Sequence, residues 1–217
     1  MISLVLCFVG AFLLSAGLGK PLIARLQRLG VRQTVSEDAP STHAAKQHTP
    51  TMGGVLFLLS ATLVPLFYLA YSPERNEEAK TLLPIVLLTL CAGIIGFIDD
   101  YRKVTRGKNL GLKAREKLAG QTFVMALFAI WLFRTPGFEA RVQVTPFIAG
   151  GACFVDFGLL YLPFALLYLI GFSNATNLTD GLDGLSGGVS LIISLTLTAL
   201  LNHSNFQPLG IFTVAMA

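Results

Sequence analysis

The chain has 217 residues, of which 53% are hydrophobic and 13% are charged. A soluble domain of this length carries about 25% charged residues, so the composition excludes an ordinary soluble protein and favours a polytopic membrane protein. The net charge of +4 comes from a few basic loops, which argues against a nucleic-acid partner and favours contact with membrane lipids or phosphate groups.

Seven apolar runs follow one another along the chain. They occupy residues 2–19, 52–72, 81–98, 118–133, 157–179, 184–201 and 208–217. Roughly 20 apolar residues in a helix cross the ~30 Å hydrocarbon layer, so the first six runs predict full transmembrane helices and the last predicts the start of a seventh. We expect a single all-α integral-membrane domain over 1–217.

A small β-hairpin is expected near 141–157, between the fourth and fifth spans. Val142 and Val144 alternate with polar residues there, and Gly150 and Gly151 supply a turn. Pro146 removes a backbone donor, so the strand it follows belongs at an edge.

Lysine and arginine are divided unevenly between alternate loops. Loops 20–51 and 99–117 hold five and seven of them, whereas loops 73–80 and 134–156 hold two each. The positive-inside rule therefore places the N-terminus and the hairpin outside, and the ends of the first, third and fifth spans in the cytoplasm.

The first polar motif precedes the second span, at residues 46–54 (Lys-Gln-His-Thr-Pro-Thr-Met-Gly-Gly). Thr49 is a good N-cap and Pro50 suits the first helical position, so we expect the helix to start there. Free N–H groups at such a start favour a phosphate. The alternative is a simple capped helix whose glycines pack against a neighbouring helix.

Asp99 and Asp100 end the third apolar run and are followed by Lys103. Neighbouring helical residues point about 100° apart, so we expect one carboxylate to face a metal ion or substrate while the other faces Lys103. Mg²⁺ prefers one or two carboxylates, completed by water and substrate phosphate. The alternative, two solvated acids at a helix end, would oppose the helix dipole.

The third motif interrupts the apolar sequence at residues 174–185 (Asn-Ala-Thr-Asn-Leu-Thr-Asp-Gly-Leu-Asp-Gly-Leu). Asp180 and Asp183 stand three apart and would share a face of a helix. Two glycosylation sequons occur here, but the predicted cytoplasmic location argues against their use. A purely structural turn would not require so many amides, hydroxyls and carboxylates.

Together these segments resemble the family of phospho-N-acetylmuramoyl-pentapeptide transferases, within the polyprenyl-phosphate N-acetylhexosamine-1-phosphate transferase superfamily. The resemblance is carried by residues 37–40 (Glu-Asp-Ala-Pro), 49–54, 97–103 and 174–185. It implies an enzyme of peptidoglycan synthesis in the bacterial cytoplasmic (inner) membrane, with its active site facing the cytoplasm. A homodimer is left open.

The reaction that the resemblance implies moves phospho-MurNAc-pentapeptide from UDP-MurNAc-pentapeptide to undecaprenyl phosphate, giving lipid I and UMP with Mg²⁺ as cofactor. Carried over by motif, the catalytic residues are Asp99, Asp100, Asp180 and Asp183, and the substrate-binding residues are Lys46, Thr51, Lys103, Asn174 and Asn177. Asp99 and Asp100 are the candidate metal ligands, and Asp99 is also the candidate general base.

The family's later aspartate and histidine motifs have no counterpart in these 217 residues. We therefore expect the chain to be the N-terminal portion of such an enzyme, inactive alone, with the main metal ligand beyond Ala217. The alternatives are a sister transferase that moves another sugar phosphate and a non-catalytic fragment. An ion transporter with an aspartate relay is disfavoured, because these acids cluster at one membrane edge.

Overall fold

The computed structural model describes residues 2–28, 52–72, 75–106, 111–144, 153–180, 184–204 and 206–217. Its helices are α1 (Ile2–Arg28), α2 (Gly54–Tyr71), α3 (Arg75–Arg106), α4 (Ala114–Arg134), α5 (Tyr161–Thr179), α6 (Leu185–His203) and α7 (Gln207–Met216). A 3₁₀ turn, Gly158–Leu160, leads into α5. Helices α1 to α6 are long and apolar enough to cross a membrane. The prediction of a polytopic helical membrane protein is confirmed, while the side that holds the N-terminus stays a prediction.

The expected hairpin is present. Strand β1 (Arg141–Val144) pairs antiparallel with β2 (Cys153–Asp156), with the first residue of β1 opposite the last of β2. Arg141 and Asp156 are therefore cross-strand partners of opposite charge, with Nε 3.8 Å from Oδ2. The predicted turn at Gly150 and Gly151 lies outside the described residues.

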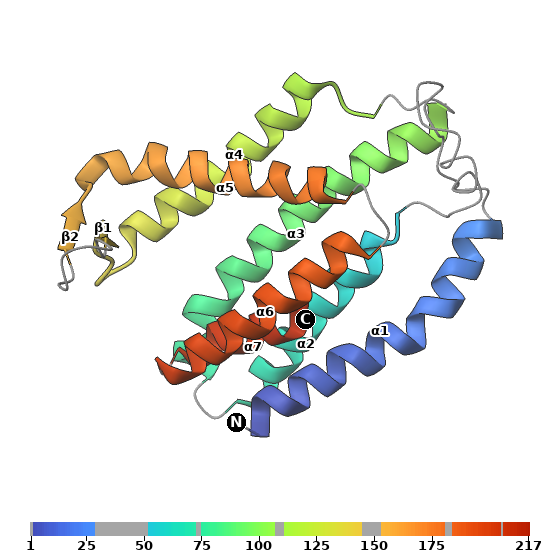
Figure 1. The fold of residues 1–217 in the computed structure, drawn as a ribbon, viewed down its shortest axis with the longest axis horizontal. Helices are drawn as coiled ribbons and strands as arrows, with labels where there is room; N and C mark the ends of the chain where they lie inside the picture. Colours follow the sequence, from blue (N-terminus) through green and yellow to red (C-terminus); the bar gives the residue numbers. More distant parts are fainter. Residues whose placement is uncertain are drawn as a thin grey trace.

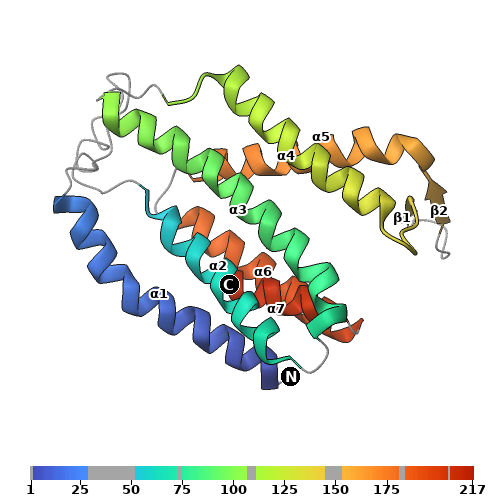
Figure 2. The same cartoon turned by 180° about the vertical axis from the view of Figure 1, so that it is seen from behind.

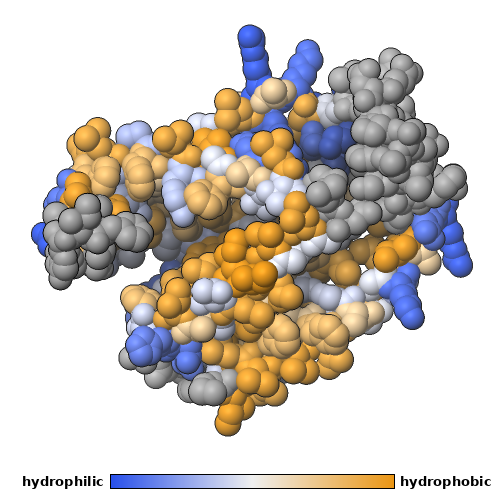
Figure 3. Space-filling model, in the orientation of Figure 1, coloured by the Kyte–Doolittle hydropathy of each residue, from blue (hydrophilic) through white to orange (hydrophobic). Residues whose placement is uncertain are grey.

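The helices are arranged as a bundle with an arm. Helices α1, α2, α3 and α6 surround α7, while α4 and α5 run beside each other away from the bundle and lead to the hairpin (Figures 1 and 2). The short helix α7 supplies the buried centre, where Ile211 and Val214 pack against Leu4 of α1, and Phe212 packs against Leu82 of α3. Figure 3 shows apolar residues over much of the bundle's surface, as expected where acyl chains replace water.

Polar side chains also join helices inside the bundle. The Ser15 and Ser60 hydroxyls lie 2.6 Å apart between α1 and α2. At the opposite helix ends, Tyr68 donates to the buried Glu78 carboxylate at 2.7 Å, and Ser72 donates to the other oxygen of the same carboxylate. Such bonds satisfy polar groups that lipid cannot hydrate.

Two expectations about helix ends were wrong. Helix α2 begins at Gly54 rather than at Pro50, because Met52 adopts a left-handed backbone with φ of 70°, which interrupts a helix. Helix α3 has 32 residues and is about 48 Å long at 1.5 Å per residue, which exceeds the hydrocarbon layer. It continues to Arg106, so Asp99 and Asp100 lie about two turns before its end rather than at it.

Candidate functional site

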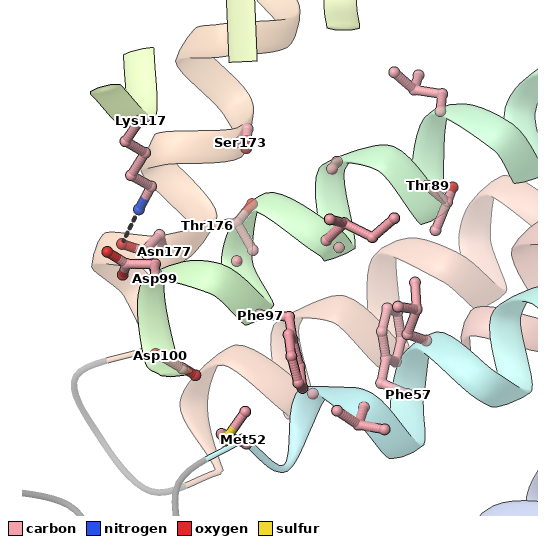
Figure 4. Close-up of a pocket in the computed structure, with 18 of the residues that line it drawn as sticks. Met52, Phe57, Thr89, Phe97, Asp99, Asp100, Lys117, Ser173, Thr176 and Asn177 are labelled. Carbon is pink, nitrogen blue, oxygen red and sulfur yellow. Dashed lines mark hydrogen bonds between the residues drawn. The ribbon is translucent and has the colours of Figure 1, made fainter. Parts of the chain in front are cut away.

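A cleft of about 750 Å³ opens between helices α2, α3, α4 and α5, with the last residue of α7 also in its lining. Most of its lining is apolar and comes from Met52, Val55, Phe57, Leu58, Leu88, Ile94, Phe97, Met125 and Met216. In Figure 4 the labelled polar residues Asp99, Asp100, Lys117 and Asn177 gather at one end, and Phe57 lies toward the other. One end of the cleft is therefore charged, and the rest of the cleft is lined mainly by apolar side chains.

Asp99 is held through both carboxylate oxygens. The backbone N–H of Leu112 donates to Oδ1 at 2.7 Å, and Lys103 Nζ lies 2.8 Å from Oδ2. The Asp99 side chain is 13% exposed. Bonds in which one partner is charged are stronger than neutral ones, so this carboxylate has a fixed orientation beside the loop that precedes α4.

Lys103 contacts the second carboxylate as well, because its Nζ lies 3.0 Å from Asp100 Oδ1. The expectation that only one of the two aspartates faces Lys103 was wrong, and which of them faces a metal ion or substrate stays a prediction. A lysine one turn further along a helix reaches both the i−3 and the i−4 positions. Asp100 is 34% exposed, so it is the more accessible of the two acids.

Lys117 at the start of α4 donates a hydrogen bond of 3.2 Å to Asn177 Oδ1 near the end of α5 (Figure 4). This lysine was considered in the sequence only as part of a basic loop, so its place in the cleft was missed. A signal was present one turn later, where Gln121 interrupts an otherwise apolar run. Polar residues inside spans usually face the protein interior.

Gln121 is buried and joins α4 to α5. It donates to Ser173 Oγ at 3.2 Å and accepts a bond of 3.1 Å from Asn174 Nδ2. Asn174 also donates to the Ile170 carbonyl at 2.9 Å. Asn174 therefore links α5 to α4 and is not among the residues that line the cleft, and a contact between it and substrate stays a prediction.

The other predicted site residues lie either outside the cleft or outside the described residues. Asp180 is exposed at the C-cap of α5, three positions beyond Asn177, and does not line the cleft. Lys46, Thr51 and Asp183 lie outside the described residues. The structure thus brings together Asp99, Asp100, Lys103 and Asn177 of the predicted set, and adds Lys117.

The two carboxylates at this end of the cleft suit a metal ion that needs few protein ligands. Within the residues described, no three or more His, Cys, Asp or Glu side chains are grouped as a metal site would require. Mg²⁺ is commonly bound through one or two carboxylates, with water and substrate phosphate completing the octahedron. The Asp99–Asp100 pair fits that smaller set, and Asp100 is the more open ligand.

Comparisons with known proteins support the resemblance found in the sequence. A sequence model described as glycosyl transferase family 4 matches residues 82–217, and the phospho-N-acetylmuramoyl-pentapeptide-transferase signature 1 matches residues 46–58. Proteins named phospho-N-acetylmuramoyl-pentapeptide-transferase from Acetivibrio thermocellus and Halalkalibacterium halodurans are 38% and 37% identical over 98% of this chain. One from Heliobacterium modesticaldum is 34% identical over 100% of it. The chain spans 62%, 63% and 64% of these relatives' respective lengths.

Proposed function

Because the chain belongs to glycosyl transferase family 4 and carries a phospho-N-acetylmuramoyl-pentapeptide-transferase signature, we propose that it serves the reaction named by its relatives. In this reaction phospho-MurNAc-pentapeptide moves from UDP-MurNAc-pentapeptide to undecaprenyl phosphate, giving lipid I and UMP. The chain spans less than two thirds of those relatives, so the proposal concerns an enzyme of their length that contains these residues.

The observation that carries the proposal is that one end of the cleft is charged while the rest of its lining is mainly apolar. A polyprenyl phosphate has the same division, with an anionic head on a long hydrocarbon chain. The charged end offers Lys117, and Lys103 is paired with its two lining carboxylates, Asp99 and Asp100. The lining beyond that end includes Phe57, Leu58 and Phe97. Lysine binds phosphate as a point charge, so the acceptor's phosphate would lie beside these ammonium groups.

The chemistry needs little proton transfer. A phosphate monoester has a second pKa near 6, so the acceptor is mostly dianionic near neutral pH. One of its oxygens would attack the sugar-side phosphorus of the diphosphate, and the bond from that phosphorus to the oxygen of UMP would break. Positioning and neutralisation of charge dominate such transfers.

The chain's own residues would do the positioning. Lys103 and Lys117 would hold phosphate oxygens, and Asn177, bonded to Lys117, would fix that lysine's direction. Asp100, with Asp99 beside it, would hold Mg²⁺. When bound, Mg²⁺ neutralises diphosphate charge that would otherwise repel the anionic acceptor.

The protein is a multi-pass membrane protein by its six span-length apolar helices, and we place it in the bacterial cytoplasmic membrane with this end of the cleft toward the cytoplasm. Basic residues support that orientation. Arg25 and Arg28 occupy the last turn of α1, and Lys103 and Arg106 that of α3. Positive charge accumulates on the cytoplasmic side of membrane proteins.

The test uses the full reading frame that contains these residues, purified and reconstituted in nanodiscs with undecaprenyl phosphate and Mg²⁺. UDP-MurNAc-pentapeptide and UDP-N-acetylglucosamine are offered separately, and UMP release and the lipid product are measured by mass spectrometry. We expect product from the first donor and none from nanodiscs without enzyme. Product from the second donor alone would indicate a sister transferase, and product from neither would contradict the proposal.

A further inference from the structure

Beyond the groups assigned above, a segment of backbone before α4 contacts the aspartate pair. We propose that Gly111 and the N–H of Leu112 form a clamp on Asp99 that positions Lys103 for the phosphate of the lipid acceptor. Gly111 would then be a positioning residue of the reaction. The substrate in this inference rests on the proposed function, whereas the clamp itself rests on contacts within the chain.

The steric part of the clamp depends on glycine. A Cβ at position 111 would lie 2.9 Å from Asp99 Cγ and 2.9 Å from the Asp99 carbonyl oxygen, and would overlap Oδ1 as well. Real Cβ atoms essentially never approach other heavy atoms this closely. Because one of these contacts is with the backbone of α3, a change of the Asp99 rotamer could not relieve the overlap. Any other residue here would force the segment away from α3.

The polar part of the clamp uses both oxygens of one carboxylate. Leu112 N–H donates to Asp99 Oδ1 at 2.7 Å, which turns Oδ2 toward Lys103 Nζ at 2.8 Å. Both oxygens are thus engaged within the chain, and this arrangement suits a carboxylate that aims a lysine better than one that takes a proton from substrate. This inference replaces the general-base role expected for Asp99 from the sequence.

Lys103 is aimed by two acids of unequal exposure. Asp99 is 13% exposed and fixed by Leu112, whereas Asp100 is 34% exposed and binds the same ammonium group at 3.0 Å. The clamp therefore anchors Lys103 from the protein side and leaves Asp100 on the open side. A shift of about 1 Å in such an anchored group can cost a large factor in rate or binding.

A second, separate contact holds α4 to α3. Arg102 Nη1 donates to Glu116 Oε2 at 2.7 Å, and the same oxygen accepts from the Lys113 N–H at 3.2 Å. None of these contacts involves Gly111, Leu112 or Asp99, so a substitution at position 111 does not remove any of their groups. A variant at position 111 is therefore expected to keep the α3–α4 connection while it loses the position of Asp99.

The experiment compares Gly111→Ala with Gly17→Ala in the full-length enzyme. Gly17 lies in α1, and a Cβ added there has nothing within 4 Å. We expect Gly111→Ala to raise KM for undecaprenyl phosphate about tenfold or more, the size of one lost charge-assisted hydrogen bond, while KM for the sugar nucleotide changes less than about twofold. Gly17→Ala should leave both unchanged. Loss of folded enzyme would lower the rate without such a selective change.

A double-mutant cycle supplies a readout that does not need activity. The loss of Tm caused by Gly111→Ala is measured in the wild type and in an Asp99→Ala background, where the carboxylate is gone. A smaller loss in that background supports the clamp. Equal losses, an unchanged acceptor KM, or an equal rise in both KM values would each overturn it. If the wild-type enzyme forms no lipid product, the proposed function fails, and the Tm cycle still decides the clamp.

Discussion

Lys117 of α4 and Asn177 of α5 are joined by a hydrogen bond of 3.2 Å, although they lie 60 positions apart in the chain. The bond lies beside Asp99 and Asp100 at the charged end of the cleft (Figure 4). It brings an ammonium group from the basic loop region to the amide of the third motif. The aspartate motif (residues 97–103) and the third motif (residues 174–185) therefore meet beside Lys117, which belongs to neither motif.

This contact makes Lys117→Met a direct test of the cleft. The change keeps the length and apolar stem of the side chain but removes the charge and the bond to Asn177. A charge-assisted hydrogen bond contributes about 1.5–3 kcal/mol, so we expect kcat/KM to fall by roughly 10- to 100-fold. The measurement is lipid product formed per folded enzyme in nanodiscs.

The matched control for Lys117→Met is Lys80→Met. Lys80 pairs with Glu77 at the first turns of α3, and both side chains are at least 70% exposed. An exposed pair of this kind contributes little to stability, and it lies at the other end of α3 from the aspartates. We expect its activity to match the wild type. Equal activity of both variants would contradict a place for Lys117 in the site.

The buried Gln121 should matter for stability. Gln121→Leu removes the hydrogen-bond partner that the partly buried Ser173 and Asn174 share, and Asn174 keeps its bond to the Ile170 carbonyl. Such a loss costs about 1–3 kcal/mol, and each kcal/mol lowers Tm by about 2–4 °C in a protein of this size. Thermal unfolding in detergent measures the shift.

Thr196→Val is the control for the Gln121 prediction. The Thr196 hydroxyl donates within its own helix, to the Ile192 carbonyl at 2.8 Å, and its side chain is exposed. We expect its Tm to stay within about 1 °C of the wild type, in line with surface substitutions. A Gln121→Leu variant as stable as this control would show that the α4–α5 arm does not depend on these bonds.

The spans and the hairpin could be predicted because their signals are local. An apolar run of sufficient length is a helix wherever it lies in the membrane, and the alternation at Val142 and Val144 indicates a strand. Helix ends were less predictable. Nothing in the composition of 99–106 distinguishes a basic loop from a helix that leaves the membrane. The left-handed backbone of Met52 could not be predicted from its residue type, because residues other than glycine rarely adopt it.

The same distinction between local signals and long-range packing applies to the site. Lys103 follows Asp99 and Asp100 by one turn, so their proximity could be read from the sequence, although its contact with both was not foreseen. The pairing of Lys117 with Asn177 could not be read, because it depends on how α4 and α5 pack. The fit of Gly111 against Asp99 likewise requires the folded path of the chain.

The orientation in the membrane can be tested with single cysteines in a background without the three native ones. Arg28 and Arg106 end α1 and α3 and are exposed, whereas Glu139 is exposed next to the hairpin. We expect a membrane-impermeant thiol reagent to label Glu139→Cys in intact cells, and to label Arg28→Cys and Arg106→Cys after the membrane is opened. Labelling of all three positions from one face would contradict the prediction that the hairpin and the ends of α1 and α3 lie on opposite faces of the membrane. The reverse pattern would show that the whole orientation is inverted.

The two aspartates should differ in their response to Mg²⁺. Asp100 is the more exposed acid, whereas both oxygens of Asp99 are occupied by Leu112 and Lys103. We expect Asp100→Asn to raise the Mg²⁺ concentration for half-maximal activity about tenfold or more, since outer-shell changes already cost 10- to 100-fold in metal affinity. Asp99→Asn should lower the maximal rate with a smaller change in that concentration.

Asp156→Asn is the control for this comparison, because Asp156 is an exposed acid of the hairpin, paired with Arg141. It should reproduce the wild-type Mg²⁺ titration, and EDTA should abolish activity in every variant. The titration with product detection separates affinity from maximal rate. A larger Mg²⁺ shift in Asp99→Asn than in Asp100→Asn would reverse the assignment, because the clamped carboxylate would then be the one that the metal reaches.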